Sequence, residues 1–401
     1  MTAFVRTASQ PMTNPLEGTL KGLRVLDFSQ IAAGPLCTMF LGDMGAEVVK
    51  VEPPEGDVAR KLGPPFVNGE STLFLSLNRN KRSIVCDLKT EDGRQRAHRL
   101  IDGADVLVES FRPGVAERLG VGFADSRERN PRLIYCSISA FGQAGPWAKK
   151  PGVDGALQAV SGLMSITGTE GQAPSKLQTP VVDMAAGYHA TIAILSALQM
   201  RQSGHVPDRL DVSLFAAALM LQQIPLAGYL MSAELPLRTG SGAPYATPNE
   251  AYETSDGHIL VAAYQEAHWR KFCVAIDRPQ LADDARFRTL SQRMNYRVEL
   301  CDEINAALRH RTTAEWVDVL AEFELICAPV ANYCDVVKSP QFAASGIVTS
   351  ADHSVAGSIA MPGFAIGGRS AAVASPPPLL GEHNDCSDWR TWPAYQSSEE
   401  E

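Results

Sequence analysis

Short apolar runs alternate with amphipathic segments along the first 140 residues of the chain. The runs are rich in Val, Ile and Leu, which is typical of buried β-strands. Between them, residues 31–45 carry apolar positions at helical spacing and residues 91–102 form a charged helical segment. Strands that alternate with helices in this way predict an α/β fold with a doubly wound parallel sheet. The predicted strands are residues 24–29, 47–52, 83–88, 105–110 and 133–139.

The pattern changes in the second half of the chain. A long apolar helix is expected over residues 184–203, followed by a strand that enters another helix. Residues 238–252 form a Gly-, Ser- and Pro-rich connection, longer than a structural loop needs to be, so we interpret it as a candidate active-site lid or hinge. It leads into a predicted hairpin that turns at Asp256-Gly257 and into amphipathic helices over residues 266–325. These elements indicate a second, smaller domain.

One uncharged run, residues 212–231, is long enough to raise the question of a membrane span. Gln222, Gln223 and Pro225 lie in its middle, and no second such run is evident, so we expect a buried helix and no membrane partner. The first residues of the chain lack the continuous apolar core of a secretory signal, which favours a cytoplasmic protein.

Composition and charge narrow the class of partner. Apolar residues make up 45% and charged residues 20% of the chain, an ordinary globular balance. The net charge of -9 argues against nucleic acid as a partner. The eight cysteines are scattered without a CxxC pair, so the sequence predicts neither a zinc site nor a disulfide framework, and no metal is expected.

In a parallel sheet, ligands bind beyond the carboxyl ends of the strands. Glu52 stands at one such end and could bind a ribose hydroxyl, but the turn after the first strand reads SQIAAGP and lacks GxGxxG, which argues against a dinucleotide cofactor. The chain has no GxSxG elbow, which argues against a serine hydrolase. Basic residues near the strand ends, from Arg79 to Arg82 and at Arg112 and Arg118, are either solvated surface charges or a cradle for a phosphorylated ligand.

Asp183 lies in the segment TPVVDMAAG (179–187). It follows a short apolar run and stands at an expected chain reversal of small residues. We expect it to follow a strand and to open a helix. Asp is a preferred residue just before a helix, so the residue by itself favours a helix cap. A carboxylate in this place can also act as a nucleophile. The local sequence leaves both interpretations open.

Six segments of the chain, taken in order, resemble the motifs of the class III CoA-transferases, the CaiB/BaiF family of formyl-CoA and carnitine CoA-transferases. The resemblance covers roughly residues 17–385, nearly the whole chain. The segments are GPLCTMFLGDMGAEVVKVE (34–52), NRNKRSIVCDL (78–88), DVLVESFRPGVAERLG (105–120), SAFGQAGP (139–146), the Asp183 segment and APYATPNEAYETSDGHILVA (243–262).

This resemblance implies a Rossmann-like large domain made from both chain ends, plus a smaller α+β domain between them. The large domain is expected over residues 17–225 and 331–386, and the small domain with its linkers over 226–330. Residues 1–16 and 387–401 are expected to be flexible tails. Two subunits of such a chain are expected to form an interlocked homodimer, threaded through each other as rings.

The resemblance also implies the chemistry. Asp183 matches the catalytic aspartate, whose carboxylate attacks an acyl-CoA donor, possibly succinyl-CoA, to give an aspartyl mixed anhydride and the CoA thiolate. An aspartyl-CoA thioester then forms and passes CoA to a free small carboxylic or dicarboxylic acid. Acyl-CoA and the acid are substrates, and no tightly bound cofactor is expected. A helix N-terminus would help to keep the Asp183 carboxylate ionised, and Asp183 is expected also to cap its helix.

Matching the family's contact positions residue by residue gives the expected CoA site. Pro53 stands where some members have an arginine, so Arg60 or Arg82 is expected to supply a missing phosphate contact. Lys176 and Gln178 either recognise a second carboxylate or are plain surface residues. The expected contacts are Ile31, Ala32 and Ala33 along the adenine and pantetheine path, Lys81 and Arg82 at phosphate, Ser110 and Phe111 at the base, Arg118 and Leu119 nearby, and Gly240, Ser241 and Gly242 in a lid.

Two alternatives remain beside the transferase. Racemases of the same fold pair the aspartate with a histidine thirty residues earlier, because proton exchange on the two faces of the substrate needs two bases. This chain has Val153 at that place, and valine carries no exchangeable proton; His189 is expected to be an ordinary helix histidine. A non-catalytic CoA-binding protein is the other alternative, and the intact Asp183 argues against it.

Overall fold

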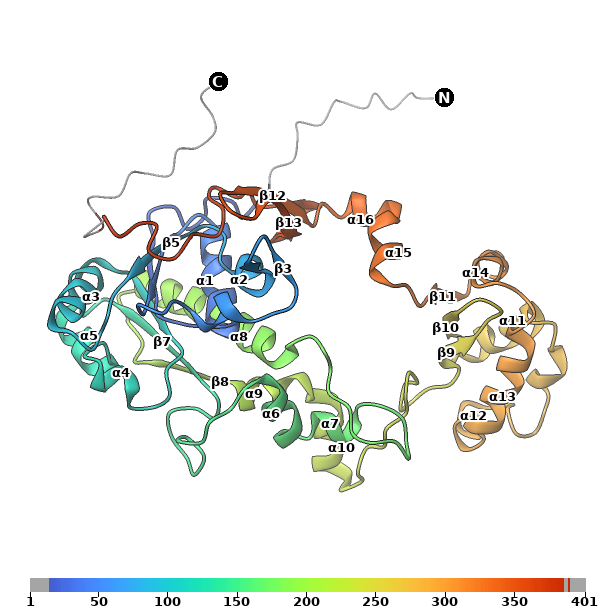
Figure 1. The fold of residues 1–401 in the computed structure, drawn as a ribbon. Coiled ribbons are helices and arrows are strands. Elements are labelled where there is room, and N and C mark those ends of the chain that lie inside the picture. The colour runs from blue at the N-terminus through green and yellow to red at the C-terminus, as the bar shows by residue number, and fades with distance from the viewer. Residues whose placement is uncertain (1–13, 386–388, 390–401) are drawn as a thin grey trace. The chain divides into compact units, whose positions relative to one another are not determined.

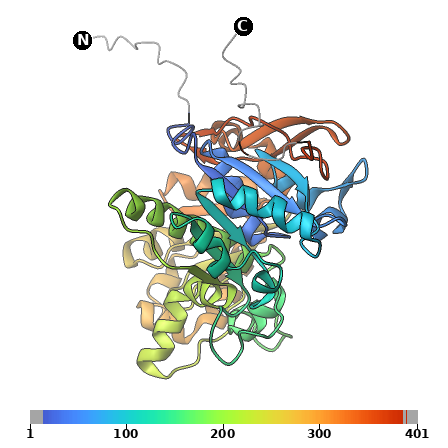
Figure 2. The same cartoon turned by 90° about the vertical axis from the view of Figure 1, so that its left-hand side faces the viewer.

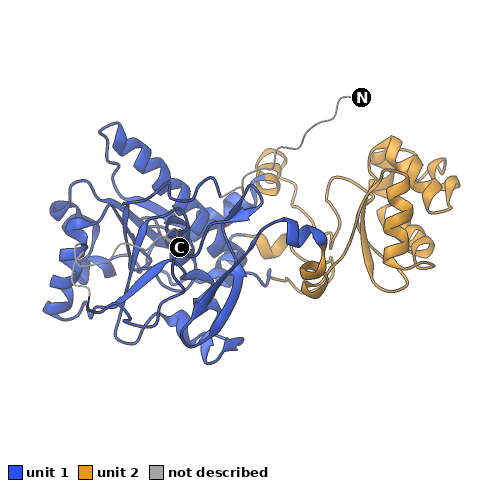
Figure 3. Ribbon diagram, turned by 90° about the horizontal axis from the view of Figure 1, so that it is seen from above, with its two compact units in different colours: residues 1–161, 177–223, 340–401 blue, residues 162–176, 224–339 orange. Residues whose placement is uncertain are grey.

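The computed structural model describes residues 14–385 and Trp389, and it divides into two compact units (Figure 3). Unit 1 comprises residues 1–161, 177–223 and 340–401, and unit 2 comprises residues 162–176 and 224–339. Unit 1 is therefore built from both chain ends. The division assigns residues 162–176, 224–225 and 331–339 to the smaller unit, beyond the range expected from the sequence. The expected tails, residues 1–16 and 387–401, lie almost entirely outside the described residues.

Unit 1 is organised around a six-stranded sheet in the order β5-β2-β1-β6-β7-β8 (Figure 1). All five neighbouring pairs are parallel, which confirms the predicted sheet. The first strand lies in the middle, where Val25 pairs with Val48 on one side and Val106 on the other. The strands are β1 (Arg24–Asp27), β2 (Glu47–Glu52), β5 (Lys81–Val85), β6 (Val106–Glu109), β7 (Ile134–Ser139) and β8 (Leu210–Ser213).

Alternate residues of these strands enter two separate cores, one on each face of the sheet. Val25 and its paired valines pack with α1 (Ala33–Asp43), α8 (Val181–Gln202) and α9 (Leu214–Leu221). Leu26 faces the other way and packs with α3 (Glu91–Gly103), on the side that faces the viewer in Figure 2. Side chains on a strand alternate between the two faces, and both faces of a parallel sheet are covered, so apolar residues of the strands are buried on both faces.

Gly187 allows α8 and α1 to approach each other closely. A Cβ at this position would lie 2.8 Å from the carbonyl oxygen of Ala33 and 2.9 Å from Leu36 Cδ2. The contact joins the second turn of α8 to the first turn of α1. It therefore brings the beginning of α8, where Asp183 lies, against the beginning of α1.

The run 212–231 does not form the single buried helix expected from its composition. It supplies the end of β8, then α9, and then α10 (Gln223–Ser232), a separate helix in which no residue is buried. The Gln222 side chain, at the break, donates to the carbonyl oxygens of Ala218 and Ser161 at 2.9 and 3.1 Å, and Pro225 lacks a main-chain donor. Helix α8 is itself apolar and long enough to cross a membrane, but residues such as Ala186 pack into the sheet core.

The C-terminal part of unit 1 returns to the edge of the sheet. After α16 (Pro340–Ala344) come two small hairpins, and the chain then runs beside β5, where the N–H of His383 donates to the carbonyl oxygen of Ser83 at 2.9 Å. Asn384 accepts the N–H of Val85 at 2.8 Å. The hairpins are β12 (Val348–His353) with β13 (Gly357–Pro362), and β14 (Ala365–Ile366) with β15 (Arg369–Ser370).

Unit 2 contains a three-stranded antiparallel sheet in the order β11-β10-β9. The predicted hairpin is confirmed, with a turn in which the N–H of Thr254 donates to the carbonyl oxygen of Gly257 at 3.0 Å. The elements around its core are β9 (Asn249–Glu253), β10 (His258–Ala262), β11 (Ile326–Pro329), α11 (Glu266–Ala275), α12 (Leu290–Asn295), α13 (Arg297–Leu308), α14 (Thr313–Glu322) and α15 (Tyr333–Lys338).

Candidate active site

Asp183 is the third residue of α8, which begins directly after Pro180. Residues 177–180, which lead into the helix, form no strand, so the strand expected there is absent. Asp183 does not cap the helix either. The cap comes from Asp154 at the start of α6 (Asp154–Val160), whose Oδ2 accepts the N–H groups of Val182 at 2.8 Å and Asp183 at 3.2 Å.

The Asp183 carboxylate is partly buried, and within residues 14–385 and Trp389 no group donates a hydrogen bond to it. Burial, and secondarily the negative charge of Asp154, raise the pKa of Asp183 to about 7. Burial and the charge of Asp154 therefore outweigh the stabilisation of the ionised carboxylate that was expected from the helix N-terminus. Near neutral pH the side chain exchanges between an ionised form that can attack a thioester and a protonated form that cannot.

The residue after Asp183 belongs to an apolar cluster. Met184 packs against the cluster that contains Ala32 and Leu36, and Ile31 packs against the same cluster. This contact and the close approach at Gly187 place the candidate nucleophile beside the segment expected to carry CoA, residues 31–33. Asp183 and residues 31–33, which are about 150 residues apart in the sequence, therefore lie close together in unit 1.

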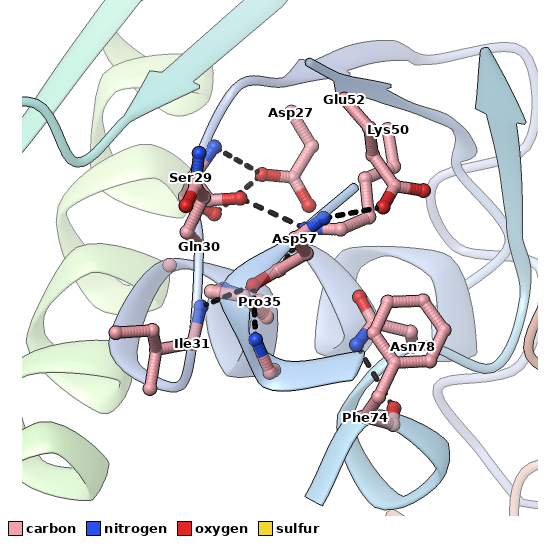
Figure 4. Close-up of polar contacts among 12 residues, drawn as sticks. Asp27, Ser29, Gln30, Ile31, Pro35, Lys50, Glu52, Asp57, Phe74 and Asn78 are labelled. Carbon is pink, nitrogen blue, oxygen red and sulfur yellow. Dashed lines mark hydrogen bonds and ion pairs between the residues drawn. The ribbon is translucent and has the colours of Figure 1, made fainter. Parts of the chain in front are cut away.

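Ile31 has a left-handed backbone conformation with φ of 70°, which is strained for a β-branched residue. Its N–H donates to Asp57 Oδ1 at 3.1 Å, and the preceding N–H, of Gln30, donates to Ser110 Oγ at 3.0 Å. Asp57 is fully buried and forms an ion pair with the equally buried Lys50 at 2.8 Å (Figure 4). Buried polar groups thus fix the turn after β1.

Lys81 is bound to partners inside the protein. Its ammonium group is fully buried and binds Asp27 Oδ2 at 3.1 Å, Asn78 Oδ1 at 2.9 Å and the carbonyl oxygen of Pro35 at 2.8 Å. Burial lowers the pKa of Lys81 to about 8 despite its partner. Burial alone would raise the pKa of Asp27, but the Lys81 and Lys50 charges lower it to about 2. In this structure the lysine expected at phosphate therefore forms an internal ion pair.

The other two cations expected at phosphate are engaged inside the protein as well. Arg60 forms two hydrogen bonds of 2.7 Å with the Glu52 carboxylate and lies over the ring of Phe74. Glu52 is itself buried and also accepts the Ser83 hydroxyl, so it is not free to bind a ribose. Arg82 is only 6% exposed.

A small pocket of about 90 Å³ lies beyond the carboxyl ends of β1, β2 and β5, where the sheet predicts a ligand site. Phe111 and Leu119, both expected CoA contacts, line it. Arg118, next to Leu119 in α4 (Val115–Arg118), is exposed. The sequence reasoning missed Lys89, an exposed cation that also lines the pocket; its position just after β5 was the available signal. The other lining residues are Phe28, Gln30, Val51, Glu52, Pro53, Cys86, Asp87 and Leu88.

The expected lid glycines lie in an anchored turn of unit 2. The N–H of Gly240 donates to the carbonyl oxygen of Gly168 at 2.9 Å, and the Ser241 hydroxyl accepts the N–H of Ala251 at 3.0 Å. A Cβ on Gly242 would lie 1.6 Å from the Arg297 guanidinium, so this glycine serves close packing. Closing motion of the turn would require these contacts to break.

Val153, at the position where a racemase would carry a histidine, is 65% exposed and precedes the first residue of α6. No exchangeable proton is available there. His189 is partly buried in α8, six residues after Asp183. Among the described residues, no three His, Cys, Asp or Glu side chains are grouped as a metal site requires.

The chain is similar to known proteins over nearly its whole length. The model of CoA-transferase family III matches residues 20–384. The succinyl-CoA:glutarate CoA-transferase of Mus musculus is 36% identical over 367 residues, which is 91% of this chain and 84% of the mouse protein. The probable fatty acyl-CoA transferase Rv3272 of Mycobacterium tuberculosis is 38% identical, over 93% of this chain and 98% of that protein.

The fold has solved counterparts too. A crystal structure of a CAIB/BAIF family protein from Brucella suis superimposes with a TM-score of 0.83 at 32% identity, covering 93% of this chain and 98% of that chain.

Proposed function

Because the chain belongs to CoA-transferase family III and is thus a CoA-transferase, we propose that it moves CoA from an acyl-CoA donor to a free organic acid through covalent intermediates on Asp183. The observation that carries the proposal is the environment of Asp183. Its carboxylate is partly buried and has no hydrogen-bond donor among the described residues, and its pKa is raised to about 7. Such a carboxylate is more nucleophilic than a solvated one and need not give up a protein partner before it attacks.

The reaction balances without an external energy source. The Asp183 carboxylate attacks the donor thioester, its acyl carbon–sulfur bond breaks, and a mixed anhydride and CoA thiolate result. The thiolate attacks the Asp183 carbonyl, releasing the donor acid as its carboxylate and leaving an aspartyl-CoA thioester. The acceptor carboxylate then attacks this thioester to form a second anhydride, and the thiolate completes the exchange at the acceptor carbonyl. One thioester and one carboxylate are present at the start and at the end.

Water must be kept from the anhydride during this sequence. The apolar cluster that contains Ala32 and Leu36, against which Met184 next to Asp183 packs, supports this role. For CoA itself, we propose the path from residues 31–33 to the pocket at Phe111 and Leu119. In place of Lys81 and Arg82, we propose the exposed cations Lys89 and Arg118 as phosphate contacts.

For the acids, we propose succinyl-CoA as donor and a small dicarboxylic acid as acceptor, as the name of the mouse relative suggests. Lys176 and Gln178 remain candidate contacts for a second carboxylate. The mycobacterial relative's name supports a second candidate, a fatty acid acceptor. A 2-methylacyl-CoA racemase is disfavoured because Val153 cannot carry the second proton, and a non-catalytic CoA-binding protein is disfavoured because Asp183 is intact.

We also propose the interlocked homodimer. It is supported by large apolar side chains of α10 that are exposed in the single chain, among them Ile224 and Leu230, each 74% exposed, and Met231, 87% exposed. Burial of these side chains in a dimer would remove an apolar surface that a monomer leaves in water. Size-exclusion chromatography with light scattering tests this point.

The activity test uses the purified full chain with succinyl-CoA and a panel of acids, from oxalate and glutarate to fatty acids. New acyl-CoA species are followed by liquid chromatography, and the 2-epimer of a 2-methylacyl-CoA is followed in parallel. We expect exchange with the wild type and none with Asp183→Ala, while CoA binding is kept. Epimerisation without exchange would contradict the transferase, and neither reaction across the panel would favour a non-catalytic protein.

A further inference from the structure

We propose that Asp154 is the positioning residue of the nucleophile: it fixes the first turn of α8 through main-chain hydrogen bonds and holds a second negative charge beside the Asp183 carboxylate. This inference rests on the proposed function of Asp183 and extends it. Asp154 itself is not expected to touch the substrate.

The geometry of the turn carries the first half of the proposal. The first N–H groups of a helix have no partner within the helix, and Pro180 offers no side chain to bind them. Asp154 Oδ2 accepts two of them, from Val182 at 2.8 Å and from Asp183 itself at 3.2 Å. The second bond acts on the main chain of the nucleophile, so movement of Asp154 would be transmitted directly to Asp183.

Asp154 is in turn held by a buried side chain. Gln158, one turn later in α6 and fully buried, donates from Nε2 to Asp154 Oδ1 at 2.6 Å. The same amide donates to the carbonyl oxygen of Leu177 at 3.1 Å and accepts the Leu177 N–H at 2.9 Å. Gln158 thus connects Asp154 to the segment that leads into α8. A surface helix cap would not need a buried side chain of this kind.

The negative charge of Asp154 supports the second half of the proposal. When the Asp183 carboxylate attacks a thioester, its negative charge passes to the CoA thiolate and a neutral anhydride remains beside Asp154. Repulsion between the two carboxylates is present before this step and absent after it, so Asp154 favours the acylated enzyme over the free one. The same repulsion makes the free Asp183 carboxylate harder to form.

Asp154 is the one charged group that acts on the pKa of Asp183 among the described residues. The elements packed against α8 carry other ionisable groups, and none of them contributes to the raised pKa of Asp183. These groups are Cys37 and Asp43 on α1, Tyr135 and Cys136 on β7, and Asp211 on β8. On α8 itself, Tyr188, His189 and Arg201 follow Asp183, and they do not contribute to its raised pKa either.

The test compares Asp154→Asn with Asp154→Ala in the full-length enzyme. Asn keeps an oxygen for the two N–H groups but removes the charge. We expect it to lower kcat about tenfold and to move the acidic limb of the kcat/KM profile down by about one pH unit, because Asp183 then ionises more easily. Ala removes the hydrogen bonds as well, and we expect a loss of about a hundredfold in kcat. CoA affinity should stay within about twofold in both.

A matched control separates this effect from the loss of any helix cap. Thr312 caps α14 in unit 2 with a complete capping box. Thr312→Ala is expected to lower the melting temperature as Asp154→Ala does, but to leave the pH profile unchanged. A pH profile of Asp154→Asn that coincides with the wild type, in a folded protein, would overturn the proposal.

A second readout does not depend on catalysis. Carbodiimide labels protonated carboxyl groups, and peptide mass spectrometry gives the labelling of Asp183 as a function of pH in wild type and Asp154→Asn. We expect the midpoint to move down by about one pH unit; an unchanged midpoint would refute the role of the charge. If the midpoint moves but no variant, Asp183→Ala included, loses exchange, the proposed function fails and the pairing of the two carboxylates stands.

Discussion

The Asp57 carboxylate accepts the main-chain N–H of Ile31 at 3.1 Å and forms a fully buried ion pair with Lys50 at 2.8 Å. This relationship places a strained turn beside the candidate nucleophile. We predict that Asp57→Ala destabilises the protein by about 3 to 5 kcal/mol, because it leaves the Lys50 ammonium buried without its carboxylate. Urea unfolding measures this change. A loss below about 1 kcal/mol would show that the pair does not hold the turn.

Lys81 provides a second test of a buried pair. We predict that Lys81→Met lowers the free energy of unfolding by about 3 kcal/mol or more, since it leaves Asp27 buried without its cation. The double variant Asp27→Asn with Lys81→Met should recover part of that loss, because both charges are then removed. If Lys81→Met instead leaves stability unchanged and raises the Kd for CoA, the lysine binds phosphate after all.

Lys89 and Arg118 should behave in the opposite way. Both are exposed at or beside the pocket, so their removal leaves no buried charge. We predict that Lys89→Ala or Arg118→Ala raises the KM for acyl-CoA about tenfold, leaves kcat unchanged and shifts the melting temperature little. Lys271, an exposed lysine in unit 2 that pairs with Glu324, is a matched control for Lys89. Equal KM values for the Lys89 and Lys271 variants would exclude the proposed contact.

Stability should depend on pH through Asp183. The carboxyl group titrates at about 3.8 in the unfolded chain and at about 7 in the folded protein, so the folded state binds the proton more tightly between these values. The ionised side chain therefore costs stability above about pH 7 and nothing below about pH 4. We predict that Asp183→Asn is more stable than the wild type by about 2 kcal/mol at alkaline pH, since solvent reaches part of the side chain, and that the difference vanishes at acidic pH. A difference that does not change with pH would contradict the raised pKa.

The sheet was predictable because its signal is local. A run such as 47–52 is rich in valine and matches β2 in length and position. The charged residues were harder to interpret, because their partners come from distant strands. The sequence predicts Lys81 as a phosphate contact, and its pairing with Asp27 depends on the order of β5, β2 and β1 in the sheet.

In the candidate site, too, residues with a local sequence signal were predictable and contacts between distant segments were not. Asp183 was found from its motif, but its cap was not, since Asp154 lies 29 residues earlier and meets α8 only after α6 has folded against it. The exposure of α10 was also missed. Its composition is that of a buried helix, and nothing within the run indicates that its apolar residues remain uncovered in a single chain.

The central claim is that Asp183 becomes acylated. The wild-type enzyme is incubated with succinyl-CoA without acceptor, treated with hydroxylamine, and digested for peptide mass spectrometry. Hydroxylamine converts an aspartyl anhydride or thioester into a hydroxamate. We predict a hydroxamate at Asp183 that requires the acyl-CoA and is absent in Asp183→Asn. Exchange that proceeds without any label at Asp183, or with the label at Asp154 instead, would contradict the assignment of the nucleophile.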